Sequence, residues 1–203
     1  IDVFGSDAFR YYFMSAIAFG HDGSFSWEDL AARYQAELAN GFGNLASRTT
    51  AMIERYFEGI IPPEGTITDG DRKIQEIVRD AAANADAAID RLAIDEAVAA
   101  IWTIVDALNG YITENEPWAL AKDDAQRERL GTVLYTAAEG LRALAVLMSP
   151  VIPKACETLW IALGAAETLG RLRDQPIRDA GTWGQLKPGS SVNGLAPLFP
   201  RVE

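Results

Sequence analysis

The sequence has little of what most catalytic and metal centres require. Its 203 residues include one cysteine, Cys156, and one histidine, His21. A single cysteine excludes an internal disulfide framework and a cysteine-rich metal site, and it is typical of a protein in a reducing compartment. His21 lies among Asp and Gly residues typical of a turn, with no Ser or Cys beside it. We therefore interpret His21 as a solvated turn residue rather than a catalytic base.

Other signatures of chemistry are missing as well. The sequence has no Gly-rich loop with a lysine that would bind phosphates, and no His, Cys and Glu residues at the spacing of metal ligands. Asp and Glu are numerous, but on the expected helices they fall opposite the apolar residues, which indicates solvated faces. We predict no catalytic residue, no metal site and no bound cofactor in this chain.

Basic residues are in deficit. Lys and Arg number 18 against 29 Asp and Glu, a formal net charge of −11. This balance excludes a broadly basic protein that coats nucleic acid, and it gives no reason to expect DNA as a partner. Any RNA binding must then be local. Hydrophobic residues make up 49% of the chain, which is ordinary for a globular domain with a real core.

No apolar run approaches the roughly 18–20 residues needed to cross a bilayer. The longest, from Ala97 to Val105, is followed at once by Asp106. The chain begins at Ile1 and has no leader of the secretory kind, which we interpret as the start of a segment cut from a longer protein. We expect a cytoplasmic protein that does not contact membranes.

Capping signals and apolar spacing predict an all-α fold. We expect Ser6 to cap a first helix that runs to about Ala18, and Ser26, with Asp29 three residues later, to open a long helix. Three more helices follow from apolar residues at steps of four and three, a pattern typical of an antiparallel α-helical bundle. Their stripes are Ile74, Val78, Ala81, Ala85, Ala88 and Leu92; Ile94, Val98, Ile101, Val105, Leu108 and Ile112; and Leu130, Leu134, Ala137, Leu141, Leu144 and Met148.

Glycine and proline mark the interruptions. The long helix should reach about Phe57, and Gly41 and Gly43 within it predict either a bend or the close approach of a neighbouring helix. A last helix is expected from about Pro153 to Leu163. Residues 164–203 should form an irregular tail that is pinned to the bundle. Its apolar anchors would be Trp183, Leu195, Leu198 and Phe199.

Two places offer candidate binding residues. Asn40, Asn44 and Arg48 stand at steps of four, which aligns two carboxamides and a guanidinium on one helix face. On spacing alone, surface or interhelix polar bonding is the commoner explanation. Pro117 and Trp118 follow the end of a long helix, where an indole is either a plug in the core, the commoner case, or a stacking platform for an unpaired base.

Several segments together make the sequence similar to a known family. They are GSDAFRYY at 5–12, DGSFS at 22–26, LAN at 38–40, GNLASR at 43–48, PWALAK at 117–122 and PLFPR at 197–201. In this order and over nearly the whole chain they resemble the methionyl-tRNA synthetase family of class I synthetases. The resemblance is to the carboxy-terminal portion only, because the HIGH-type and KMSKS-type signatures, the nucleotide-binding sheet and the zinc-binding insertion have no counterpart here.

The resemblance implies a division of the chain and a site. Residues 1–25 would be a remnant of the stem-contact region, 26–163 the helical anticodon-binding domain and 164–203 the packed tail. The positions that match the family's readers of the C-A-U anticodon of methionine tRNA are Asn44, Arg48 and Trp118, with Asn40 and Pro117 as supporting neighbours. Arg48 and Asn44 would donate to O2 and N3 of cytosine while its ring stacks on Trp118.

The resemblance also implies what lies elsewhere. The full-length enzyme would charge tRNA with methionine using ATP, and ATP and methionine would bind its catalytic domain, so this chain alone should be inactive. Besides the anticodon loop, its partner would be that catalytic domain, for which Phe9, Tyr12 and Phe13 are candidate contacts. Two alternatives stay open: a helical protein-interaction module, and the anticodon-binding domain of a related class I synthetase for isoleucine, valine, leucine or cysteine.

Overall fold

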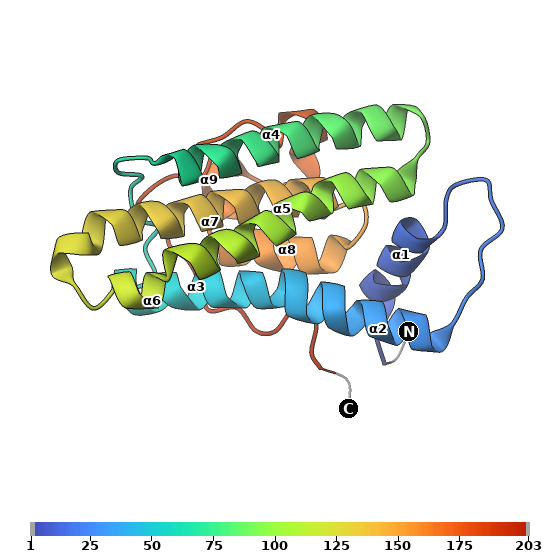
Figure 1. The fold of residues 1–203 in the computed structure, drawn as a ribbon, viewed down its shortest axis with the longest axis horizontal. Coiled ribbons are helices and arrows are strands. Elements are labelled where there is room, and N and C mark those ends of the chain that lie inside the picture. The colour runs from blue at the N-terminus through green and yellow to red at the C-terminus, as the bar shows by residue number, and fades with distance from the viewer. Residues whose placement is uncertain (1–2, 202–203) are drawn as a thin grey trace.

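The computed structural model describes residues 3–201 and shows an all-α bundle (Figure 1). Within these residues the chain forms no β-strand, only one isolated antiparallel bridge between Ile60 and Ser191. The main helices are α1 (Gly5–Ala16), α2 (Trp27–Arg33), α3 (Asn44–Phe57), α4 (Asp69–Asp90), α5 (Ile94–Asn115), α7 (Arg127–Met148) and α8 (Pro153–Ala162). Shorter elements are the π-helix η1 (Tyr34–Gly43), α6 (Pro117–Leu120), α9 (Ala165–Leu169) and the 3-10 turns η2 (Asp124–Gln126), η3 (Leu172–Asp174) and η4 (Ile177–Asp179).

The long helices run side by side along the molecule. In Figure 1, α2, η1 and α3 form one continuous rod, and α4, α5 and α7 lie along it. The ends of α3 and α5 and the starts of α4 and α7 gather at the end of the bundle that carries α6, whereas α1 packs at the opposite end (Figure 1). The three helices predicted from apolar stripes are confirmed, except that Leu92, the last residue of the first stripe, lies beyond the end of α4 and is exposed.

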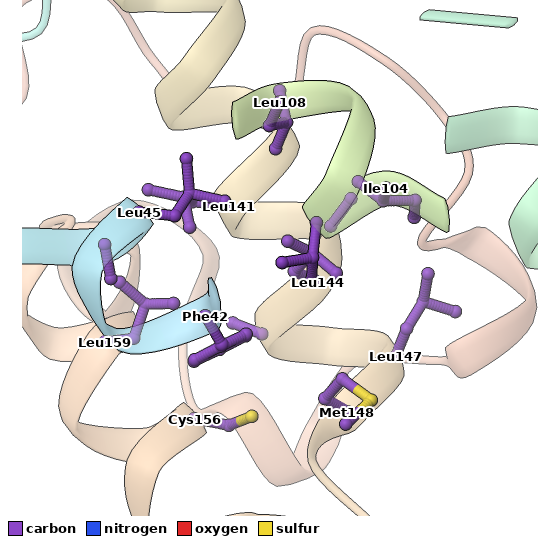
Figure 2. Close-up of a cluster of buried hydrophobic side chains, with 14 of the residues drawn as sticks. Phe42, Leu45, Ile104, Leu108, Leu141, Leu144, Leu147, Met148, Cys156 and Leu159 are labelled. Carbon is purple, nitrogen blue, oxygen red and sulfur yellow. The ribbon is translucent and has the colours of Figure 1, made fainter. Parts of the chain in front are cut away.

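The centre of the bundle is α7, in which every residue from Leu130 to Met148 is buried. Figure 2 shows its leucines meeting Phe42 of η1, Leu45 of α3 and Ile104 of α5. A helix that is covered on all sides must be apolar all round. For this reason the segment Asp124–Met148 is long and apolar enough to cross a membrane, yet its apolar window is wholly buried in the bundle. We assign it to the core.

The start of the first helix differs from the prediction. Helix α1 begins at Gly5, so Ser6 lies inside it and makes no cap, and the residue before the helix, Phe4, has no capping hydrogen bond. The helix ends at Ala16, because Ile17 turns to an extended conformation. Ser26 does cap α2 and accepts a hydrogen bond from the backbone of Asp29 at 3.3 Å.

The glycines of the long helix lie where its hydrogen-bonding pattern changes. Residues Tyr34–Gly43 are π-helical, and regular α-helix resumes at Asn44. A Cβ on Gly41 would lie 3.3 Å from the Trp102 side chain, and one on Gly43 would lie 3.0 Å from the Leu38 carbonyl oxygen. Close approach by α5 is therefore one reason for glycine at position 41.

The expectation that helical Asp and Glu lie on solvated faces is wrong at three positions. Asp7 of α1 is buried, with 6% of its surface exposed. Asp71 of α4 and Glu139 of α7 are fully buried. Glu139 is compensated by Arg142 at 2.9 Å and by the backbone N–H groups of residues 184, 185 and 186. Arg142 in turn donates to the carbonyls of Ala180 and Thr182. A pair of buried charges thus ties the tail to the central helix.

The tail is packed, as predicted. Phe199 is buried against Tyr34 and Phe42, and Trp183, Leu195 and Leu198 are partly buried against the core. The hydroxyl of Tyr34 donates to the Pro200 carbonyl at 2.6 Å.

Near the N-terminus, one of the three residues expected to contact the catalytic domain is not exposed as that role requires. Tyr12 is buried, with 2% of its surface exposed, because its ring packs edge-on against Phe13 and Phe25. Phe13 is exposed and Phe9 half-buried, and His21 lies in an exposed turn.

Candidate nucleic-acid interface

Arg48 and Trp118 meet at one end of the bundle. The guanidinium carbon of Arg48, on α3, lies over the Trp118 ring at 5.7 Å from its centroid. This is the geometry of a cation–π pair, worth about 0.5–1 kcal/mol at an exposed site. Trp118 is 38% exposed, so a large part of the indole is open to solvent. The structure therefore joins the two stretches that sequence analysis singled out, and it shows Trp118 not to be a buried plug.

A sharp corner of the backbone carries Trp118. Helix α5 ends at Asn115, Glu116 takes a left-handed conformation with φ 42°, and Pro117 is the first residue of α6. The Glu116 N–H closes the end of α5 by donating to Ile112 at 3.2 Å, and its carbonyl accepts the first hydrogen bonds of α6. Pro117 is buried, and its fixed φ suits the start of a helix. The indole thus stands on a corner, not on a flexible loop.

Asn40, Asn44 and Arg48 lie on the exposed side of the rod that η1 and α3 form. The Asn40 carboxamide accepts a hydrogen bond from Gln35 at 3.3 Å. Among residues 3–201, the side chains of Asn44 and Arg48 form no hydrogen bond or ion pair with one another or with other residues. Their donors are therefore free for a ligand, whereas Asn40 is partly committed to its own helix.

The π-helix ends immediately before Asn44. The N–H of Asn44 donates to Ala39 and Gly41, and Asn109 of α5 donates its side-chain amide to the Gly41 carbonyl at 3.4 Å. Segments of π-helix are often found at functional sites. Sequence analysis did not single out Asn109. The signal was present, since Asn followed by Gly inside a helical pattern is unusual and has to be explained by packing or function.

A buried polar network lies behind the corner. Asp71 accepts from both terminal nitrogens of Arg129, at 2.5 and 3.0 Å, from the Tyr111 hydroxyl, and from the backbone and hydroxyl of Thr68 at 2.7 and 3.0 Å. Burial opposes ionisation of Asp71, but the hydrogen bonds from Arg129 and Thr68 outweigh it and lower the pKa of this carboxyl to about 2. Burial and the bond to Asp71 raise the pKa of Tyr111. The sequence carried a signal for the contact between Thr68 and Asp71, because these two residues have the spacing of a capping box.

The chemistry available at this surface is recognition rather than reaction. An open indole offers a platform for a planar base, and a guanidinium and a carboxamide beside it offer several N–H donors. Among the described residues, no group of three or more His, Cys, Asp or Glu could hold a metal ion. The side chains present suit a few directional contacts to one flat, polar ligand.

Two known families match the chain. A family described as the anticodon binding domain of methionyl tRNA ligase matches residues 61–203, and a family described as class I tRNA synthetases (M) matches residues 1–50. Asn40, Asn44 and Arg48 therefore lie in the part matched by the class I family, and Trp118 lies in the part matched by the anticodon-binding family.

Individual relatives are similar over the whole chain. Methionine–tRNA ligase of Streptomyces coelicolor is 50% identical over 203 residues, which are 98% of this chain and 38% of the relative. The same enzyme of Caldanaerobacter subterraneus is 38% identical over all of this chain and 31% of its own length. The chain thus spans about a third of the curated relatives it matches.

Solved structures show the same likeness. Apo methionyl-tRNA synthetase of Mycobacterium tuberculosis superposes with a TM-score of 0.90 at 29% identity, over 100% of this chain and 40% of the other. A complex of that enzyme with methionyl-adenylate gives a TM-score of 0.90 over 98% of this chain and 38% of the other.

Proposed function

The chain belongs to the methionyl-tRNA synthetase family and carries its anticodon-binding domain, and from that premise we propose that the surface formed by Asn44, Arg48 and Trp118 reads the C-A-U anticodon of methionine tRNA. The observation that carries the proposal is the placement of the Arg48 guanidinium over the partly exposed Trp118 ring. Asn40 and Pro117 support the site: Asn40 extends the row of amides and Pro117 fixes the corner.

The pattern of donors suits the first base of that anticodon. An unpaired cytosine offers O2 and N3 as acceptors and a π face for stacking. Arg48 and Asn44 supply free donors, and Trp118 supplies the platform, where stacking is worth about 1–3 kcal/mol per base. Uracil carries N–H at position 3, so a donor facing it is left unpaired, at a cost of about 1–3 kcal/mol. Discrimination then comes from that penalty.

The negative charge of the chain is compatible with this role. With a formal net charge of −11, it has no broad basic surface to hold the phosphate backbone. A few directional contacts to splayed-out bases need only local donors. We propose that the enzyme of which this domain is a part charges tRNA with methionine, that ATP and methionine bind outside residues 1–203, and that the enzyme works in the cytoplasm.

An exposed group of aromatic side chains at α1 is the proposed contact with the catalytic domain. Phe13, Phe25 and Trp27 are 40–57% exposed. Phe25 stacks with Phe9 and Phe13 and packs edge-on against Trp27, which also packs edge-on against Phe9. A solvent-facing aromatic cluster is typical of an interaction surface. It lies within residues 1–50, which match the class I synthetase family.

A titration with RNA hairpins tests the proposed function. The 203-residue chain is titrated, at fixed salt, into fluorescently labelled hairpins that carry C-A-U, U-A-U or G-A-U in the loop, and binding is followed by anisotropy. We expect C-A-U to bind roughly 5- to 100-fold more tightly than U-A-U. Equal weak binding of all three would overturn the proposal, and a preference for G-A-U would contradict the assignment of Arg48 and Asn44 to a cytosine as the first base.

A further inference from the structure

Arg129 reaches three helix ends at once. It stands in the first turn of α7, where the start of α4 and the end of α5 also lie (Figure 1). Its two terminal nitrogens donate to the Asp71 carboxylate of α4, and Nη2 also donates to the Asn115 carboxamide oxygen at 2.6 Å. Asn115 is the last residue of α5. The Arg129 side chain therefore links α7 and the start of α4 to the corner that carries Trp118.

Hydrogen bonds of the Asn115 side chain hold the corner between α5 and α6. The Asn115 carboxamide is fixed at both ends, since its nitrogen donates to the Tyr111 carbonyl at 2.9 Å while its oxygen accepts from Arg129. Directly after it, Glu116 takes a left-handed conformation. A residue other than glycine keeps such a conformation only where its surroundings impose it. Trp118 follows two residues later on α6, which has four residues and cannot fix its own orientation.

On the strength of the proposed function, we propose that Arg129 is a positioning residue: through Asn115 it fixes the corner between α5 and α6, so that the Trp118 ring lies beneath the Arg48 guanidinium before RNA binds. Packing alone accounts for the joining of α4, α5 and α7, because their apolar stripes are already buried against one another. Buried ion pairs are weak contributors to stability, and their best-attested role is to fix one geometry. Both carboxylate oxygens of Asp71 accept hydrogen bonds, and this full pairing holds the Arg129 guanidinium in one position.

The test separates positioning from stability. The chain is labelled with 5-fluorotryptophan, and the Trp118 resonance in the 19F NMR spectrum is assigned by its loss in Trp118→Phe. Asn115→Ala removes the acceptor that links Arg129 to the corner, together with the Asn115 bond to the Tyr111 carbonyl, and leaves the Arg129–Asp71 pair in place. Arg129→Lys keeps the positive charge next to Asp71 but removes the two-pronged guanidinium. Arg142→Met is the matched control: it removes a second ion-paired arginine, one that is fully buried, about 20 Å away along the same helix, where its carbonyl partners belong to the tail.

We expect Asn115→Ala and Arg129→Lys to move or broaden the Trp118 resonance and to weaken C-A-U hairpin binding roughly 3- to 30-fold. Arg142→Met should lower the melting temperature at least as much while leaving the Trp118 resonance and the affinity in place. An unchanged Trp118 resonance in both corner variants would overturn the inference, as would equal effects from Arg142→Met. The 19F spectrum is recorded without RNA, so the positioning role of Arg129 can be judged even if the unmodified chain shows no preference for C-A-U. Such a lack of preference would contradict the proposed function and not the role of Arg129.

Discussion

The guanidinium of Arg48 and the indole of Trp118 are brought together across the interface of two helices, with 5.7 Å between the guanidinium carbon and the ring centroid. Arg48 is on α3 and Trp118 on α6, and the whole α4–α5 hairpin separates them in sequence. A base that stacks on Trp118 would thus lie beside the guanidinium donors of Arg48.

Removing either member should weaken RNA binding without unfolding the bundle. We expect Trp118→Ala and Arg48→Ala each to reduce the free energy of binding to a C-A-U hairpin by roughly 1–3 kcal/mol. Fluorescence anisotropy measures the loss, and circular dichroism should show unchanged helix. Trp27→Ala and Arg91→Ala are the matched controls, because both side chains are exposed and belong to other parts of the surface. Loss of helical signal in a site variant would show that the residue is structural.

The two asparagines should contribute unequally. The side chain of Asn44 has no hydrogen-bond partner among the described residues, whereas the carboxamide of Asn40 accepts a hydrogen bond from Gln35. We expect Asn44→Ala to cost about 1 kcal/mol of binding to the C-A-U hairpin, and Asn40→Ala clearly less. The same titration, run side by side on the two variants, checks the order. A larger loss at Asn40 would mean that this side chain leaves Gln35 to contact the RNA.

Local periodicity predicted the helices because it depends on one element at a time. The stripes on α4 and α5 repeat every three or four residues, and their burial follows from that repeat. On α7 the repeat predicted the helix, but not the burial of every residue from Leu130 to Met148. The burial of Asp71 and Glu139 could not be predicted in this way. Their compensating groups, Arg129 and the backbone of the tail, come from distant parts of the chain and have no fixed spacing.

The candidate site was predictable in part for a similar reason. Spacing aligned Asn40, Asn44 and Arg48 on one face, but only the resemblance to a family linked them to Trp118. The π-helix before Asn44 was not foreseen, since Gly41 and Gly43 indicate only that something unusual happens there. Its register depends on the approach of Trp102 and Asn109 from α5.

The Asp71 network should make stability depend on pH at acid values. The pKa of Asp71 is about 2 in the folded protein and about 3.9 in an unfolded chain. The folded state therefore binds fewer protons in this interval, and the free energy of unfolding falls as the pH drops from about 4 to about 2. Above pH 5 this contribution should be constant.

Urea unfolding at pH 6, 4 and 2.5 measures the effect, with Asp71→Asn as the comparison. The variant should be less stable at pH 6 and should lose less stability on acidification than the unmodified chain, because the other carboxyl groups titrate in both proteins. Parallel pH profiles would contradict the assignment of this titration to Asp71.

The buried pair of Glu139 and Arg142 should control the tail. Glu139→Ala leaves the N–H groups of residues 184–186 and the Arg142 charge without their acceptor, and breaking a buried pair in this way costs about 3–5 kcal/mol. We expect a lower urea midpoint and faster chymotryptic cleavage after Trp183, which directly precedes these N–H groups. Glu128→Ala, on the same helix but at the surface, should change neither by a comparable amount. Cleavage at the unmodified rate would mean that apolar packing alone holds the tail.

Two glycines should respond in opposite directions to the same substitution. Gly110 lies inside α5, and a Cβ built there meets nothing within 4 Å. Gly110→Ala should therefore stabilise the bundle by about 1 kcal/mol through helix propensity, which raises the melting temperature of a domain of this size by about 2–4 °C. Gly164 has φ +68°, and a Cβ there would lie 2.2 Å from the Ser191 carbonyl oxygen. Gly164→Ala should lower the melting temperature, because backbone strain and overlap act together. Thermal unfolding followed by circular dichroism compares both variants, and a loss of stability at Gly110 would show that α5 is packed more closely there than the structure describes.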